Sequence, residues 1–136
     1  MAIRVVCAGT FDFLHQGHID FLNQAKALGD ELVVIVARDE TVKRIKGFVP
    51  AHNEGLRISR IRETGIPDSV VPGNLQGGLF RILDELDPDV IALGYDQRVS
   101  EEEVLKRCRK CKVVRLNSYH PEKFKSSLYR NRERAE

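Results

Sequence analysis

The chain of 136 residues has little or none of several residue types that mark specialised proteins. It has no tryptophan, one methionine and three cysteines, too few for the disulfide framework of a small secreted domain. No apolar run approaches the roughly 20 residues of a membrane-spanning helix. The first residues lack the charged region and cleavage site of a signal peptide. These absences favour a cytoplasmic protein that does not enter a membrane.

Charge of one sign is also scarce. The chain has 22 Lys and Arg against 20 Asp and Glu, which gives a formal net charge of +2. A dedicated nucleic-acid-binding protein would carry a basic face, so a nucleic-acid partner is not expected. Hydrophobic residues make up 42% and charged residues 31%, as in ordinary globular proteins. The length fits one domain over residues 1–136.

Short apolar runs alternate with helical patterns along the chain. The runs predict buried strands at residues 3–8, 31–37, 69–71, 89–94 and 112–116. The helical patterns lie at residues 19–28, 39–47, 53–62, 78–86, 100–110 and 126–134. Asp39 and Asn53 are expected as N-caps, and Gly29 as the residue that ends the first helix. The alternation predicts a single Rossmann-like α/β domain with about five parallel strands and helices on both faces.

One stretch, from Gly9 to His18, joins the first expected strand to the first helix. It reads Gly-Thr-Phe-Asp-Phe-Leu-His-Gln-Gly-His. Gly17 lets a ligand approach the backbone closely, and a helix N-terminus favours an anionic phosphate. His15 and His18 can donate hydrogen bonds that stabilise charge developing on that phosphate. The stretch predicts a nucleoside triphosphate site that activates the α-phosphate, although either histidine alone could be an ordinary polar residue at a helix start.

Five motifs together resemble the cytidylyltransferase-like nucleotidylyltransferase superfamily. They are Gly-Thr-Phe-Asp followed by His-x-Gly-His at 9–18, and residues 29–34, 37–43, 88–97 and 125–127. Residues 37–43 and 93–97 are most similar to archaeal FAD synthases, enzymes that transfer AMP from ATP to FMN. Glycerol-3-phosphate cytidylyltransferase, which uses CTP, is the alternative within the superfamily. A catalytically silent nucleotide-binding module is the alternative of another class, against which the intact histidine pair argues.

The resemblance implies a role for each motif. His15 and His18 would stabilise the α-phosphate in the transition state, and Lys46 would neutralise phosphate charge. Nucleotide binding is implied for Gly9, Thr10, Phe11, Gly17, Lys43, Gly94, Tyr95, Asp96, Ser126 and Ser127. Lys43 is the other candidate for the role of Lys46, and a solvated helix face explains both lysines equally well. A divalent cation, Mg²⁺, would bridge the triphosphate with Asp12 as a candidate helper, and the protein would be a homodimer.

The chain departs from the superfamily's pattern in two places. The superfamily often has an arginine two residues after a glutamate of the middle helix, whereas Arg57 here lies three residues after Glu54. Arg57 is therefore only a candidate phosphate ligand. The arginine that usually precedes the Ser/Thr pair is absent, and Lys123 or Lys125 could replace it.

The acceptor is not decided by these motifs. An FMN phosphate is already an anion, so its attack would need no general base, and alignment and charge stabilisation would suffice. A flavin ring would need an apolar slot. The residues that could line it are Phe11, Phe13, Phe48, Tyr95 and Tyr119. Core packing explains such residues equally well.

Overall fold

The computed structural model describes residues 2–73, 78–94, 101–107 and 111–116. Its strands are β1 (Arg4–Gly9), β2 (Glu31–Val36), β3 (Ser69–Pro72), β4 (Val90–Leu93) and β5 (Lys112–Arg115). Its helices are α1 (Gln16–Lys26), α2 (Asp39–Lys46), α3 (Glu54–Glu63), α4 (Gly78–Leu86) and α5 (Glu101–Arg107). Within these ranges no helix combines the length and apolar character needed to cross a membrane. The helix expected at 126–134 lies outside the described residues.

The strands form one parallel sheet in the order β3-β2-β1-β4-β5, which confirms the predicted Rossmann-like α/β architecture. The central strand is β1, where Val6 lies opposite Val33 on one side and Ile91 on the other. The chain builds outward from β1 to β3 and then crosses back to β4. The strand order therefore reverses between β1 and β4, where folds of this kind bind ligands beyond the carboxyl ends of the strands.

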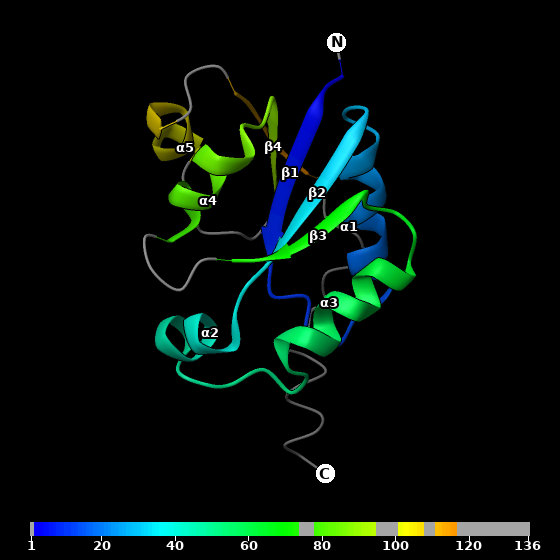
Figure 1. The fold of residues 1–136 in the computed structure, drawn as a ribbon, viewed down its shortest axis with the longest axis vertical. Coiled ribbons are helices and arrows are strands. Elements are labelled where there is room, and N and C mark those ends of the chain that lie inside the picture. Colours follow the sequence, from blue (N-terminus) through cyan, green and yellow to red (C-terminus); the bar gives the residue numbers. More distant parts are fainter. Residues whose placement is uncertain (1, 74–77, 95–100, 108–110, 117–136) are drawn as a thin grey trace.

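Helices cover both faces of the sheet. Figure 1 shows α1 and α3 on one face and α4 and α5 on the other. Alternate residues of β1 point to opposite faces: Val5 and Cys7 pack into one apolar cluster and Val6 into a second. The first cluster takes its helix residues from α1 and α3, and the second from α4 and α5. Helix α2 lies beyond the carboxyl ends of the strands (Figure 1), and these ends form the edge on which the site is built.

The helix ends confirm some of the expected signals and correct others. Asn53 caps α3 as predicted, because its side chain accepts a hydrogen bond from the Leu56 N–H at 2.8 Å. Gly47, with φ of 84°, ends α2. The N-cap of α2 is Arg38, however, and Asp39 is the first helical residue, so the prediction for Asp39 was wrong.

Gly29 has a different function from the one predicted. Helix α1 ends at Lys26 with Ala27 as its C-cap, so Gly29 does not supply the left-handed residue after a cap. A Cβ atom at Gly29 would lie 2.7 Å from the backbone oxygen of Ile3 and 2.8 Å from the Val5 side chain. The glycine is needed because the chain passes close to β1, and this approach was not visible in the local sequence pattern.

Candidate active site

The turn between β1 and α1 has an unusual backbone. Phe11 and Phe13 have φ of 55° and 52°, a left-handed conformation that residues other than glycine rarely adopt. The Phe11 ring is buried, and its centroid lies 5.5 Å from that of His18 and 6.0 Å from that of Phe21. A Cβ atom at Gly9 would come within 2.9 Å of the Phe11 ring. Tight packing therefore holds the turn in this conformation.

The turn brings the two predicted histidines together. His15 is the N-cap of α1, and its Nδ1 accepts a hydrogen bond from the Gly17 N–H at 3.0 Å. A neutral His15 must then carry its proton on Nε2. The His18 ring stacks on the His15 ring with centroids 3.9 Å apart and an interplanar angle of 20°. The capping contact thus fixes both the tautomer of His15 and its place beside His18.

Both imidazoles are neutral at ordinary pH. Burial lowers the pKa of His15 to about 4. The pKa of His18 is lowered to about 3, mainly by burial and also by the neighbouring His15, while Asp12 acts in the opposite direction. Neutral imidazoles act on a phosphate as N–H donors rather than as cations. A bound triphosphate, being anionic, would raise both pKa values toward the charged form.

Asp12 holds the loop before α3 beneath this turn. Its carboxylate is buried and accepts hydrogen bonds from the N–H groups of Ala51, at 2.8 Å, and His52, at 3.1 Å. The Nδ1 atom of His52 lies 3.6 Å from an Asp12 oxygen. Because both carboxylate oxygens bind backbone N–H groups, the structure gives no support to Asp12 as a helper for a metal ion.

Arg57 is buried in the same region. Its side chain has no exposed area. The guanidinium donates from Nε to the His52 oxygen at 2.9 Å, from NH1 to the Thr10 oxygen at 2.7 Å and from NH2 to Asp39 Oδ1 at 2.6 Å. These contacts leave the guanidinium no surface for a phosphate. Sequence reasoning missed this interior role, although the altered spacing from Glu54 was a sign that Arg57 departs from the family pattern.

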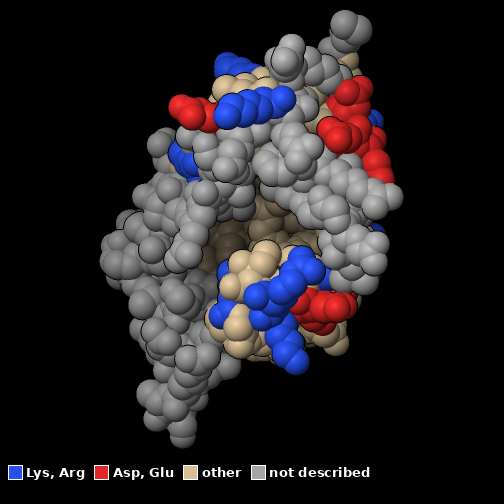
Figure 2. Space-filling view, turned by 90° about the vertical axis from the view of Figure 1, so that its left-hand side faces the viewer, with Lys and Arg blue, Asp and Glu red and all other residues tan. Residues whose placement is uncertain are grey.

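Helix α2 places a lysine against the turn. Lys46 Nζ lies 3.2 Å from the Thr10 hydroxyl, so the structure joins two residues predicted to contact phosphate. Lys43 is exposed one turn earlier on the same helix. The last turn of α2 is basic throughout, with Lys43, Arg44 and Lys46. Figure 2 shows Lys and Arg side chains gathered in the lower part of one face of the molecule.

The end of β4 completes the described part of the site. Cys7 of β1 pairs with Ala92 of β4, so Gly9 and Gly94, two residues further along each strand, reach the same edge. The Gly94 oxygen accepts a hydrogen bond from Arg115 NH1 at 2.8 Å. The predicted site residues that lie outside the described residues are Tyr95, Asp96, Ser126 and Ser127.

The candidate flavin slot is only partly described. Phe11 belongs to the main apolar cluster, so core packing accounts for it. Phe13 is half-buried, with its ring centroid 5.3 Å from that of His52, and Phe48 is also half-buried. Tyr119 lies outside the described residues. Phe13 and Phe48 therefore remain candidates for contact with an acceptor ring.

The described ranges contain no group of three or more His, Cys, Asp or Glu side chains that could hold a metal ion. A Mg²⁺ ion does not require such a group, because it commonly binds through one or two carboxylates together with the phosphates of its substrate. The donors of this edge are N–H groups, imidazoles and a lysine, which suit the phosphates themselves.

A parallel sheet with N–H, imidazole and lysine groups beyond its reversal point is typical of nucleotide-binding α/β proteins. The comparison with known families is more specific. The chain belongs to the Cytidylyltransferase-like family, whose model matches residues 6–132.

Among curated proteins, the chain is similar to several named FAD synthase. The protein of Aciduliprofundum boonei is 44% identical over 121 residues, 86% of this chain and 80% of the relative. That of Thermoplasma volcanium is 40% identical over 134 residues, 96% of this chain and 93% of the relative. That of Methanosarcina barkeri is 46% identical over 117 residues, 83% of this chain and 82% of the relative.

Solved structures agree on the fold. The lipopolysaccharide core biosynthesis protein from Thermoplasma volcanium has a TM-score of 0.81 at 41% identity, over 88% of this chain and 99% of that chain. The pantothenate synthetase of Thermus thermophilus has a TM-score of 0.57 at 14% identity, over 85% of this chain and 55% of that chain. The second likeness concerns the fold alone.

Proposed function

We propose that the protein is an FAD synthase, an enzyme that transfers AMP from ATP to FMN and releases pyrophosphate. The observation that supports the reaction type is the stacked pair of neutral histidines at the start of α1, beside Thr10 and Lys46. The choice of FMN as acceptor rests on the similarity to proteins named FAD synthase over most of both chains.

In the proposed reaction, an oxygen of the FMN phosphate attacks the α-phosphorus of ATP. A new P–O bond forms as the bond between the α-phosphorus and the bridging oxygen breaks, and pyrophosphate leaves with that electron pair. The second pKa of a phosphate monoester is about 6, so the attacking group is already anionic at neutral pH. The protein then has to align the reactants and stabilise the charge on the transferred phosphate.

Residues of the turn and of α2 would each bind a part of the triphosphate. His15 donates from Nε2 to an oxygen of the α-phosphate, because its Nδ1 is engaged by the Gly17 N–H. His18, stacked against it, donates to the same phosphate. Lys46 and the Thr10 hydroxyl bind the β- and γ-phosphates, whose negative charge increases as pyrophosphate leaves.

Other parts of the site are proposed from the resemblance. The backbone of Gly9, Phe11 and Gly17 contacts the triphosphate, and Lys43 is a second phosphate ligand. The base and ribose are bound at Gly94, Tyr95 and Asp96, and the distal phosphates at Ser126 and Ser127. A Mg²⁺ ion bound together with ATP would supply further charge neutralisation, and the triphosphate would provide most of its ligands.

A substrate matrix tests the function. The protein is mixed with ATP or CTP, with FMN or glycerol-3-phosphate, and with Mg²⁺, and both pyrophosphate and the nucleotide product are measured. We expect FAD from ATP and FMN and little product from the other pairs. Production of CDP-glycerol from CTP and glycerol-3-phosphate, with no FAD, would replace this function by the cytidylyltransferase alternative.

We also propose a homodimer, on the resemblance alone. Light scattering coupled to gel filtration should then give twice the chain mass of 15.5 kDa. A single-chain mass at the concentration of the activity assay would contradict the dimer and leave the proposed reaction intact.

A further inference from the structure

We propose that Arg57 is a positioning residue for this reaction, whose buried guanidinium sets Thr10 and Lys46 in the geometry that receives the triphosphate. The inference rests on the proposed function. It assigns Arg57 no contact with substrate, because the side chain has no exposed area. Its effect passes through the three segments that its nitrogen atoms join.

The first segment is the phosphate-binding turn. Arg57 NH1 donates to the Thr10 oxygen at 2.7 Å, and the described peptides include no cis bond. In a trans peptide the C=O and the following N–H point in opposite directions. Drawing the Thr10 carbonyl toward Arg57 therefore turns the Phe11 N–H away from the guanidinium. Arg57 thus fixes the orientation of a peptide whose N–H belongs to the proposed triphosphate site.

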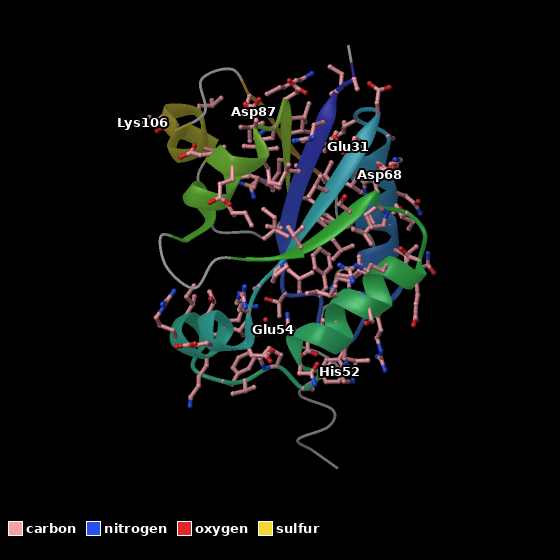
Figure 3. The ribbon with its side chains drawn as sticks, viewed as in Figure 1. Glu31, His52, Glu54, Asp68, Asp87 and Lys106 are labelled. Atoms are coloured by element: carbon pink, nitrogen blue, oxygen red, sulfur yellow. The ribbon has the colours of Figure 1, made fainter. Side chains whose placement is uncertain are left out.

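The second segment is α2, which carries Lys46. Arg57 NH2 forms an ion pair with Asp39, the first residue of α2, at 2.6 Å. Asp39 also accepts a hydrogen bond from the Glu54 N–H, and Glu54 accepts one from the Asp39 N–H, each at 3.2 Å. The side chain at the start of each helix thus accepts a hydrogen bond from the first N–H group of the other helix. Figure 3 shows Glu54 in this position, where α2 and α3 approach each other.

The third segment is the loop that precedes α3. Arg57 Nε donates to the His52 oxygen at 2.9 Å, while Asp12 accepts from the His52 N–H at 3.1 Å. Two buried charged groups of opposite sign therefore hold opposite sides of this residue's backbone. Because Asp12 belongs to the turn, the loop, the turn and α2 are joined to one guanidinium. The 3.2 Å contact between Lys46 of α2 and Thr10 of the turn therefore depends on how Arg57 holds these two segments relative to each other.

A conservative substitution tests this role. Arg57→Lys keeps the charge for Asp39 but cannot reach three acceptors in three directions. At a temperature where the variant is folded, we expect kcat to fall about 10- to 100-fold, since small misplacements in an active site have effects of that order. The KM for ATP should change much less. Arg62→Lys is the matched control, because Arg62 lies on the same helix and donates to the Val70 oxygen at 3.1 Å, away from the turn.

A double-mutant cycle tests the route of the effect. If Arg57 acts through Lys46 and Thr10, Arg57→Lys should reduce kcat far less in a Lys46→Ala background than in the wild type. Equal kcat in folded Arg57→Lys and Arg62→Lys would overturn the inference, and full additivity with Lys46→Ala would overturn the route. If Arg57→Lys does not fold, Asp39→Asn takes its place in the same cycle, with the same expectation and the same refuting result.

The wild-type enzyme separates this inference from the proposed function. Absence of FAD from wild-type protein would refute the function, whatever the variants do. If the wild type uses another substrate pair, the cycle is run with that pair. Wild-type FAD synthesis together with unimpaired Arg57→Lys would refute the positioning role alone.

Discussion

The amino and carboxyl ends of the parallel sheet both carry charged side chains, but in different surroundings. At the amino end, Arg4 and Glu31 form an ion pair of 2.7 Å with side-chain exposures of 39% and 36%. At the carboxyl end, Arg57 and Asp39 form one of 2.6 Å with exposures of 0% and 28%. Exposed pairs contribute little to stability, whereas breaking a buried pair leaves an uncompensated charge. Figure 3 shows the two ends, with Glu31 and Asp68 far from His52 and Glu54.

The partners at the two ends also differ. At the amino end, aspartates accept hydrogen bonds from backbone N–H groups near the strand starts: Asp30 from Ile3, Asp68 from Leu32 and Asp89 from Arg4. These bonds satisfy backbone N–H groups at the amino end of the sheet. At the carboxyl end, Asp12 and Arg57 join loops and helices to one another. The comparison indicates that the amino end serves the fold and the carboxyl end serves the site, and substitutions at each end can test this division.

The largest effect is expected for His18→Ala. Loss of one preorganised donor to a developing charge lowers kcat on the order of 100- to 1,000-fold. The fold should remain, as judged by circular dichroism and thermal unfolding. His52→Ala is the control, because it removes an imidazole from the same end of the sheet without touching the stacked pair. A His18→Ala enzyme with wild-type kcat would refute the proposed role of His18.

Arg57→Met should have the largest effect on stability. It removes a donor from Asp39, whose side chain is 28% exposed, and from the backbone oxygens of Thr10 and His52. Each buried acceptor left unsatisfied costs about 1–3 kcal/mol of unfolding free energy, so we expect a loss of several kcal/mol. Urea denaturation followed by fluorescence or circular dichroism measures this loss. An unfolding free energy within 1 kcal/mol of wild type, on the order of a surface pair, would show that the carboxyl end is no more integrated than the amino end.

Lys46→Ala is expected to impair activity and leave stability unchanged, because Lys46 is exposed. A hydrogen bond to a charged group contributes about 1.5–3 kcal/mol, which corresponds to roughly a 10- to 150-fold loss of kcat/KM. Lys43→Ala is compared under the same conditions. A larger loss for Lys43→Ala than for Lys46→Ala would transfer the principal phosphate role to Lys43.

The pH dependence should reveal the two half-buried histidines of the turn. Their folded-state pKa values, about 4 for His15 and about 3 for His18, lie below the ordinary value of 6.5. The unfolded chain therefore binds protons first, and stability present above pH 6.5 is lost as the pH falls toward 4 and 3. From pH 7 to pH 5, His18 should contribute a loss on the order of 2 kcal/mol.

NMR titration of the ligand-free protein gives the direct measurement. The side-chain signals of His15 and His18 should show neutral rings down to pH 5, and the signal of His15 should show the proton on Nε2. Added ATP should move both pKa values upward. A midpoint near 6.5 for either ring in the ligand-free protein would show that burial does not control that histidine.

The smallest effect is expected for Lys26→Met at the amino end. Lys26 pairs with Asp68, and both side chains are partly exposed. The substitution should change stability far less than Arg57→Met and leave kcat/KM at the wild-type value. Denaturation and the FAD assay measure the two quantities in parallel. A clear loss of kcat/KM would show that the amino end also influences the site.

Much of the fold followed from short-range patterns. The apolar runs predicted the strands, and Asn53 was identified correctly as the cap of α3 because its preference is local. The order of elements predicted a parallel sheet with its strand ends at one edge. The pairing of His15 with His18 was also predictable, since residues three apart at a helix start lie on one face.

The roles of Gly29, Asp12 and Arg57 could not be predicted in the same way. Gly29 has the features of a helix end, yet its neighbours are Ile3 and Val5, which precede it by more than 20 residues. Asp12 and Arg57 have side chains suited to a metal or a phosphate. Whether such a group meets a ligand or a backbone depends on what the fold brings beside it.

The sequence by itself determined the alternating strands and helices, the turn with two histidines and the class of chemistry that these residues favour. The tertiary structure decided which charges are buried. It turned Asp12 and Arg57 inward, joined Lys46 to Thr10 and lowered the pKa of both histidines. The physical reason is that local propensity depends on neighbours along the chain, whereas burial, ion pairing and pKa depend on groups that come together only when the chain folds.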